Sequence, residues 1–256
     1  VIGESGSGKS TLARVLAGLL PAAKGGVTLD GTPLPPTVAQ RTRDQLRRIQ
    51  IVFQMADTAL NPAHSIDRIL TRPLAFYHGK RGTAARRRVE ELLDMVKLPR
   101  AMASRLPGEL SGGQKQRVNL ARALAAEPAL ILCDEVTSSL DTVVGEAILE
   151  LLAELRRELG VALMFISHDL KTVRAVCDQV MILYAGRVME IGSGAAVTRA
   201  PAHPYADLLA ASMPQLRVGW LDGLDATRLA EVSGAADPGS VDACAFFSRC
   251  ALRSDG

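Results

Sequence analysis

Apolar residues divide the chain into short continuous runs and longer segments with a helical repeat. The runs at residues 49–53, 130–133, 161–166 and 180–184 are mostly apolar, with few interruptions. Short runs of this kind predict strands that are buried inside the protein. The sequence therefore predicts a sheet whose strands are distributed along most of the chain.

Between these runs, apolar side chains recur at intervals of three and four residues, which is the spacing of one helix face. Val89, Leu92, Leu93 and Val96 make one such face. A second face, which we expect in the core, is made by Val144, Ile148, Leu151, Leu152, Leu155 and Leu159. Strands that alternate with helices predict an α/β fold with a mostly parallel sheet flanked by helices.

The same pattern predicts how the chain is divided. Residues 1–192 carry the alternating strands and helices, with a core at 1–54 and 115–192. Loop signals and two helical stretches predict an inserted helical subdomain at about 55–114. Residues 193–256 are predicted to be a C-terminal extension, in which a short helix precedes a polar, Gly-rich tail.

Composition narrows the class of protein. The formal charge of +3 over 256 residues and the 4% of aromatic residues give no reason to expect nucleic acid as a partner. Four cysteines are too few for a disulfide framework, and Cys133 and Cys177 are predicted to be buried thiols. No apolar run approaches the roughly 18 residues that a membrane span needs. These features are typical of a soluble α/β protein.

Residues 3–10, GESGSGKS, match every position of the phosphate-binding pattern G-x-x-x-x-G-K-[ST]. The glycines let successive N–H groups point at phosphate oxygens, and Lys9 can reach the β- and γ-phosphates. A helix predicted at residues 11–20 adds the positive end of its dipole. The candidate nucleotide-binding residues are Gly3, Glu4, Ser5, Gly6, Ser7, Gly8, Lys9, Ser10 and Thr11.

A Gly- and Ser-rich loop without a ligand is the simpler alternative, but a complete match at a strand-to-helix junction favours nucleotide binding. The loop alone does not distinguish a GTPase from a kinase or a transporter motor. From their places in the pattern, the Ser10 hydroxyl can ligate Mg²⁺ and Thr11 can donate to the α-phosphate.

Residues 130–135, LILCDE, place two acids at the end of a buried strand. Open α/β sheets bind ligands at the carboxyl ends of their strands. Asp134 can therefore hold Mg²⁺ through its water shell, and Glu135 can polarise the water that attacks the γ-phosphate. The alternative is that both acids simply cap the next helix.

The class is decided by LSGGQ at residues 110–114, where two glycines precede an Ala-rich helix. A Gly-rich helix cap is the structural alternative. Together with the phosphate loop, and with Gln54, Asp141 and His168 in the same order along the chain, this stretch resembles the ATP-binding cassette (ABC) ATPases. The resemblance covers residues 1 to about 192 and implies a P-loop NTPase that binds and hydrolyses ATP.

The resemblance implies a role for each motif. Ser10, Gln54 and Asp134 would ligate Mg²⁺, Glu135 would be the general base, and His168 would contact the γ-phosphate. In this family a second cassette pairs head to tail with the first, as a homodimer, a heterodimer or a fused pair. The residues implied to lie at this interface, against the ATP of the opposite cassette, are Ser111, Gly112, Gly113, Gln114 and Asp141.

Residues 47–62, 133–141 and 200–214 resemble the importers of the oligopeptide/dipeptide/nickel branch. This implies a subunit that energises import of di- or oligopeptides or a related solute. Its partners would be two transmembrane permease subunits and, indirectly, an extracytoplasmic solute-binding protein. It would lie peripherally on the cytoplasmic face of the inner membrane. For residues 200–214, an amphipathic helix that covers a core edge is a compatible alternative.

Cys244 and Cys250 resemble the start of the cysteine-rich tail that binds an iron–sulfur cluster in some members of that branch. A cluster usually needs four thiolates, and only two of the chain's four cysteines lie in this tail. The sequence therefore favours two leftover thiols over a complete cluster site.

Two further classes compete with a transport ATPase. An ABC ATPase without a membrane partner, of the translation or DNA-repair type, would need a long insert between the phosphate loop and LSGGQ, and only about 100 residues lie there. A catalytically silent cassette is disfavoured by intact Lys9, Gln114, Glu135 and His168. The resemblance also implies an adenine-stacking region ahead of the phosphate loop, so we expect an N-terminally truncated cassette or half of a fused pair.

Overall fold

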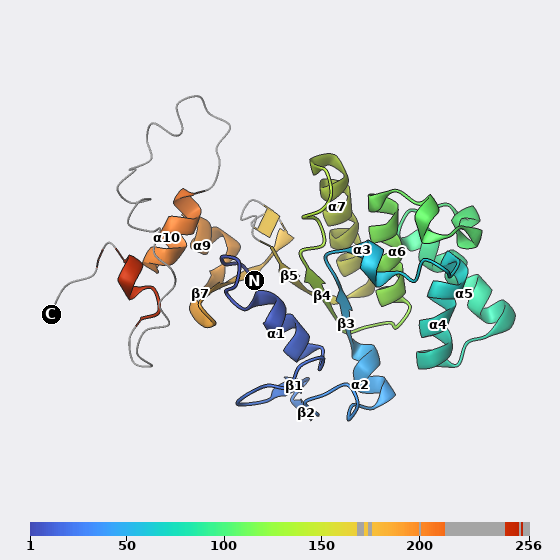
Figure 1. The fold of residues 1–256 in the computed structure, drawn as a ribbon, viewed down its shortest axis with the longest axis horizontal. Coiled ribbons are helices and arrows are strands. Elements are labelled where there is room, and N and C mark those ends of the chain that lie inside the picture. The colour runs from blue at the N-terminus through green and yellow to red at the C-terminus, as the bar shows by residue number, and fades with distance from the viewer. Residues whose placement is uncertain (168–171, 174–175, 200, 213–243, 251, 253–256) are drawn as a thin grey trace. The chain divides into compact units, whose positions relative to one another are not determined.

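A computed structural model shows how the chain folds, and its residues cluster into two compact units (Figure 1). One unit is residues 10–166, and the other joins residues 1–9 to residues 167–256. The structure describes residues 1–167, 172–173, 176–199, 201–212, 244–250 and 252.

The centre of the first unit is a three-stranded parallel sheet with the order β3-β4-β5. β3 (Ile49–Val52) and β5 (Ala162–Ile166) both pair with β4 (Leu130–Asp134), which lies between them. Ile131 and Leu132 on β4 are 1% and 0% exposed, because both faces of a parallel sheet are covered. The prediction of parallel strands is confirmed for these three. β4 is buried as predicted, whereas Gln50 and Ile51 of β3 are half-buried and only Phe165 and Ile166 of β5 are buried.

α6 (Gly112–Leu124) packs against β3, and α7 (Thr142–Leu159) packs against α6. Along α7 the core face is formed by buried Ile148, Leu151, Leu152 and Leu155, as the sequence predicts. Leu159 is 45% exposed, so its predicted place in the core is wrong. The helix ends there, and Gly160 turns the chain away in the left-handed conformation.

The segment between β3 and α6 is helical, but it holds three α-helices where the sequence predicts two helical stretches. It contains α3 (Ala56–Ala59), α4 (Ile66–His78), α5 (Gly82–Met95) and the 3₁₀ turns η1 (Arg100–Ser104) and η2 (Pro107–Glu109). α4 and α5 pack on each other and on α6 (Figure 1). The predicted apolar face lies in this shared core and is at most 1% exposed; it consists of Val89, Leu92, Leu93 and Val96.

α1 (Lys9–Leu16) is shorter than the predicted helix at residues 11–20. Gly18 adopts φ 76° and donates to the carbonyl of Val15, while the N–H of Leu19 donates to the carbonyl of Arg14. This pair of bonds is the Schellman ending of a helix, which requires a left-handed residue. The helix therefore ends at Leu16, before Pro21.

A hairpin of β1 (Val27–Leu29) and β2 (Thr32–Leu34) follows α1. The helix α2 (Arg43–Arg48) then leads into β3. The side chain of Thr42 accepts from Gln45 N at the start of α2, which is the capping arrangement expected at a helix N-terminus.

The other unit is built on an antiparallel pair, β6 (Gln179–Tyr184) and β7 (Arg187–Ser193), of which β7 was not predicted. Ile2 forms a parallel bridge to Ile182 of β6. α9 (Gly194–Arg199), α10 (Pro204–Ala211) and the 3₁₀ turn η5 (Phe247–Arg249) complete its described part. None of the helices in the described residues is long and apolar enough to cross a membrane.

Candidate active site

The phosphate-binding pattern lies in the turn between Ile2 and α1. Gly3 adopts φ 151°, and a Cβ at this position would lie 2.1 Å from the carbonyl oxygen of Leu183. Only glycine fits such a close approach of two backbones. The N–H of Ser7 donates to the carbonyl of Glu4, and Ser7 in turn accepts from the N–H of Gly186. The loop is therefore fixed from both sides by backbone contacts.

Lys9 folds back over this loop. Its Nζ atom donates to the carbonyl oxygens of Gly3 and Glu4, at 2.8 Å each, and the residue is only 6% exposed. The hydroxyl of Ser7 is buried without a hydrogen-bond partner in the described structure. A buried hydroxyl without a partner, beside an ammonium that donates to two neutral carbonyls, suits an incoming anion, because charged acceptors make stronger hydrogen bonds.

Ser10 and Asp134 meet although 124 positions separate them in the sequence. The Ser10 hydroxyl donates to Oδ1 of Asp134 at 2.9 Å, and Asp134 is 6% exposed. Asp134 is the last residue of β4, so the sheet delivers its carboxylate to the edge at which the strands end. A hydroxyl and a carboxylate at this distance are oxygen ligands of the kind that Mg²⁺ takes.

Gln54 is connected to the same strand end through Ser138. Its Nε2 donates to Oγ of Ser138 at 3.0 Å, and that hydroxyl donates to the carbonyl of Glu135 at 2.9 Å. Glu135 has φ 49°, an uncommon conformation for a residue with a side chain, and its N–H donates to Ile166 O. Gln54 follows β3 and Glu135 follows β4, so both lie at the carboxyl edge of the parallel sheet.

The LSGGQ residues form the N-terminus of α6. Oγ of Ser111 accepts from Gln114 N at 3.4 Å, and Oε1 of Gln114 accepts from Ser111 N at 3.0 Å. Gly113 faces Val144, whose Cγ1 would lie 2.5 Å from an added Cβ. Asp141 caps α7 by accepting from Val144 N at 3.0 Å. Ser111 and Asp141 therefore do cap helices within this chain, as the helix-cap alternative for LSGGQ suggests.

The remaining predicted site residues make no contact described above, and one of them lies outside the described residues. Ser5, Gly6 and Thr11 are exposed, and Gly8 is half-buried. His168 lies outside the described residues. Sequence reasoning missed Ser138, and the only available signal was a hydroxyl three residues beyond Glu135.

The cysteines do not assemble a metal centre in the described part of the chain. Cys244 is exposed, and Cys250 is half-buried. The Cys244 Sγ lies 3.7 Å from Nε2 of His203. No group of three or more His, Cys, Asp or Glu side chains that could hold a metal occurs among the described residues, so the residues present do not fit an iron–sulfur cluster. Cys133 is buried as predicted, whereas Cys177 is only half-buried.

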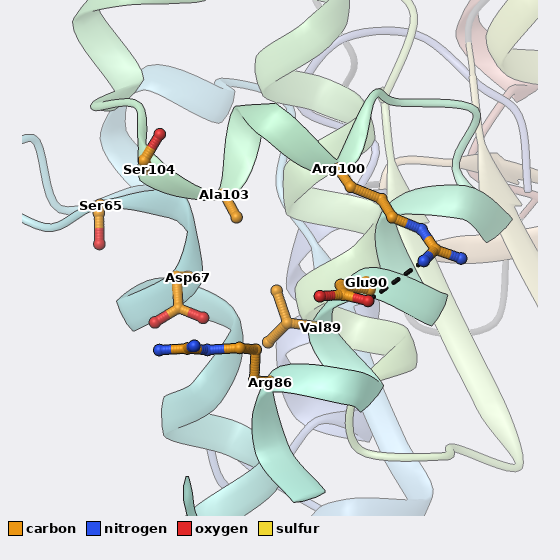
Figure 2. A pocket seen from close by; sticks show the side chains of 8 residues that line it. All are labelled: Ser65, Asp67, Arg86, Val89, Glu90, Arg100, Ala103 and Ser104. Carbon is orange, nitrogen blue, oxygen red and sulfur yellow. Dashed lines mark hydrogen bonds and ion pairs between the residues drawn. The ribbon is translucent and has the colours of Figure 1, made fainter. Parts of the chain in front are cut away.

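A pocket of about 420 Å³ lies in the helical segment and contains none of the predicted site residues. Most of the residues that line it are polar or charged, and Figure 2 shows the Arg86 side chain extending toward Asp67. Arg100 Nη1 pairs with Glu90 at 3.2 Å beside them. Because its positive and negative side chains face one another, this pocket does not present one sign of charge to a ligand.

Two family models match the chain. One, for the ABC transporter family, covers residues 1–138, and the other, for the oligopeptide/dipeptide transporter C-terminal region, covers residues 189–256. The relatives include a Brucella abortus protein named "Putative peptide import ATP-binding protein BAB2_1053", which is 39% identical over 256 residues. That match spans 100% of this chain and 75% of the relative.

The oligopeptide transport ATP-binding protein OppF of Salmonella typhimurium is 41% identical over 215 residues, which are 84% of this chain and 64% of OppF. Among solved structures, a dimeric post-hydrolysis state of the ATP-binding cassette MJ0796 bound to ADP and Pi superposes with a TM-score of 0.65. It is 33% identical, and the match covers 75% of this chain and 83% of that one.

The phosphate loop, the parallel sheet and the acids at its carboxyl edge define a P-loop NTPase. With the family match over more than half of its length, the chain belongs to the ABC transporter family and is an ABC-type ATPase that binds ATP. The predicted fold class and family are thereby confirmed.

Proposed function

We propose that this chain is the ATP-hydrolysing subunit that energises an ABC importer for di- or oligopeptides or a related solute. The support for peptide-type import is the match of residues 189–256 to the oligopeptide/dipeptide transporter C-terminal region, together with the names of the relatives. This match also favours a transporter over an ABC ATPase without a membrane partner. Residues 1–192 would then be the ATPase domain, and residues 193–256 its branch-specific extension.

The observation that carries the chemical part of the proposal is the Ser10–Asp134 contact. It joins the last hydroxyl of the phosphate-binding pattern to the last residue of a buried strand. We assign both residues, with Gln54, to the binding of Mg²⁺. A bound magnesium ion would neutralise charge that develops on the β- and γ-phosphates.

Lys9 and the amides of residues 3–11 would bind the phosphates. The Lys9 ammonium now rests on two neutral carbonyls, so exchanging them for phosphate oxygens strengthens its hydrogen bonds. Glu135 would act as general base by taking a proton from the attacking water. His168 is assigned the γ-phosphate contact from the sequence motif alone.

Ser111, Gly112, Gly113, Gln114 and Asp141 are assigned to the interface with a second cassette. This proposal adds to the cap contacts that these residues make within the chain. ATP would close the pair, and hydrolysis would reopen it. Two permease subunits would convert this movement into alternating access at the cytoplasmic face of the membrane, and a solute-binding protein would deliver the substrate to them.

Phosphate release from Mg·ATP tests the enzymatic part of the proposal. We expect Glu135→Gln to lower the rate at least 100-fold while ATP binding is preserved, since general bases typically contribute 10²–10⁴-fold. Glu146→Gln is a matched control, because Glu146 is an exposed acid on the neighbouring helix α7. Unchanged phosphate release by Glu135→Gln would contradict the assigned role of Glu135.

Peptide import is tested separately, in a complex of this chain with a second cassette, two permease subunits and a solute-binding protein. Reconstituted in lipid vesicles, the complex should hydrolyse ATP faster when a mixture of di- and oligopeptides is present with the binding protein. Stimulation by another solute class, with no response to peptides, would refute the substrate assignment and leave the ATPase assignment intact.

A further inference from the structure

A residue of the phosphate loop is tied to the far end of the chain by an ion pair. The two guanidinium nitrogens of Arg249 donate to the two carboxylate oxygens of Glu4, each at 3.0 Å. The side chain of Arg249 is 7% exposed and that of Glu4 is 41% exposed. A two-pronged pair of this kind is both stronger and more directional than a single hydrogen bond.

Arg249 is itself held in place by aromatic side chains. Its Nη1 donates to the hydroxyl of Tyr184 at 3.0 Å, and its guanidinium carbon lies 5.3 Å from the Tyr184 ring and 5.7 Å from the Phe246 ring. Tyr184, Tyr205 and Phe246 contact one another, with ring centroids 4.7 to 5.4 Å apart. Such packing fixes the guanidinium in one orientation, so its fork is preset for the Glu4 carboxylate.

The backbone of Glu4 is also held from the C-terminal part of the chain. Its N–H donates to the hydroxyl of Tyr205 at 3.0 Å, across 201 positions of sequence. Burial raises the pKa of this hydroxyl to about 12, so it remains protonated and uncharged near neutral pH. Tyr205 is completely buried at the start of α10, and the bond therefore has a rigid anchor.

The third polar group of Glu4 faces the phosphate loop. Its carbonyl accepts from Lys9 Nζ at 2.8 Å and from Ser7 N at 3.1 Å. Glu4 thus connects Arg249 and Tyr205 to Lys9 and to the turn that we assign to phosphate binding. Displacing Glu4 would displace one of the carbonyl oxygens to which Lys9 donates.

We propose that Arg249 and Tyr205 are positioning residues that hold the phosphate loop in its nucleotide-binding shape through Glu4. This inference rests on the proposed phosphate-binding role of the loop. It gives the C-terminal region a direct part in ATP affinity. The proposal assigns neither residue a direct contact with the nucleotide.

The expected effect lies on affinity, because a loop that is no longer held must be ordered by the nucleotide itself. That ordering subtracts from the binding free energy. Once ATP is bound the loop has its shape, so the rate constant of hydrolysis should hardly change. A tenfold loss of affinity, which equals about 1.4 kcal/mol, is within the range expected for coupling between two sites.

The experiment measures the Kd for Mg·ATP and the KM and kcat of phosphate release, using the whole chain and its variants. We expect Arg249→Met to raise Kd and KM about tenfold with kcat within twofold of the original. Arg249→Lys keeps the positive charge but cannot make two parallel hydrogen bonds to Glu4. Its Kd should therefore lie between the Kd of the original chain and that of Arg249→Met. Tyr205→Phe removes only the hydroxyl and should raise Kd about threefold.

Phe247→Ala is the matched control, because Phe247 lies in the same turn as Arg249 and is 47% exposed. It should leave Kd and KM unchanged. If Arg249→Met does not fold, the Glu4→Gln and Arg249→Lys variants replace it. Their double variant should then raise Kd no more than the more severe single change, because both act on one ion pair.

Three results would overturn the proposal: an unchanged Kd in the Arg249 and Tyr205 variants, a lowered Kd, or a loss confined to kcat. Failure of the proposed function would look different, since the unaltered chain would then neither bind Mg·ATP nor release phosphate. Equal Kd values for Mg·ATP in the original chain and in Arg249→Met would refute only the positioning role.

Discussion

The replacement Gly3→Ala probes the contact between the phosphate loop and β6. An added Cβ would lie 2.1 Å from Leu183 O and 3.1 Å from Leu183 C. Non-bonded carbon atoms pack at about 3.5–4.0 Å, so the two backbones must separate by roughly 1 Å. The φ of 151° adds strain for any residue with a side chain.

The loss in the free energy of unfolding depends on the overpacking and on the backbone hydrogen bonds that this separation breaks. Overpacking typically costs about 1–3 kcal/mol. The backbone bonds that flank Gly3, from Ile2 N to Met181 O at 2.9 Å and from Leu183 N to Ile2 O at 2.8 Å, contribute about 1 kcal/mol each. The free energy of unfolding should therefore fall by about 2–5 kcal/mol. At 3 kcal/mol, the Tm of a chain this long would fall by roughly 6–12 °C.

Thermal unfolding followed by circular dichroism measures the effect. Gly26→Ala is the control, because Gly26 is exposed with no atom within 4 Å of its added Cβ and no positive φ, and its Tm should hardly move. Gly6→Ala has open space but a φ of 79°, so it should lose only about 1–2 kcal/mol. Equal Tm values for Gly3→Ala and Gly26→Ala would refute the close contact.

Three further predictions concern packing and protonation. Leu92→Ala, at a fully buried site, should lower the free energy of urea unfolding by about 2–5 kcal/mol, and a loss below 1 kcal/mol would contradict its place in the core. Gly113→Ala should destabilise the chain by about 1–3 kcal/mol through Val144, and adding Val144→Ala should recover part of that loss; no recovery would exclude the contact. Burial lowers the pKa of His203 in the folded chain. As pH falls below about 6.5, the imidazole is therefore protonated more readily in the unfolded chain than in the folded one, and the free energy of unfolding decreases. His203→Asn should reduce this loss in urea titrations at pH 5.5 and 7.5, and an unchanged pH dependence would refute the assignment.

Periodicity predicted most elements because each depends on neighbouring residues. Ends of elements were less predictable, since they depend on distant contacts. Gly18 ends α1 early, and its carbonyl accepts from Val38 N at 2.8 Å. The nearby Arg41 also donates to the carbonyl of Leu16, at 2.8 Å. Neither contact leaves a trace in the apolar pattern of the helix.

The candidate site shows the same division. The phosphate loop and the acids after β4 are local patterns, so they were recognised as sequence motifs. Their connections are not local: Gln54 reaches Ser138 across 84 positions, and Glu4 reaches Arg249 across 245. In the sequence, Arg249 looks like an exposed polar residue. Nothing near it in the sequence indicates that aromatic rings bury its guanidinium group.

The central claim is that ATP binding joins two cassettes and that Glu135 is needed to separate them again. Light scattering after size-exclusion chromatography tests it directly on Glu135→Gln, with and without Mg·ATP. With nucleotide the mass should rise from 27.2 kDa to twice that value, and without nucleotide it should return to 27.2 kDa. A variant that binds ATP with its original affinity, yet keeps a mass of 27.2 kDa at saturating Mg·ATP, would contradict ATP-driven pairing between two copies of this chain.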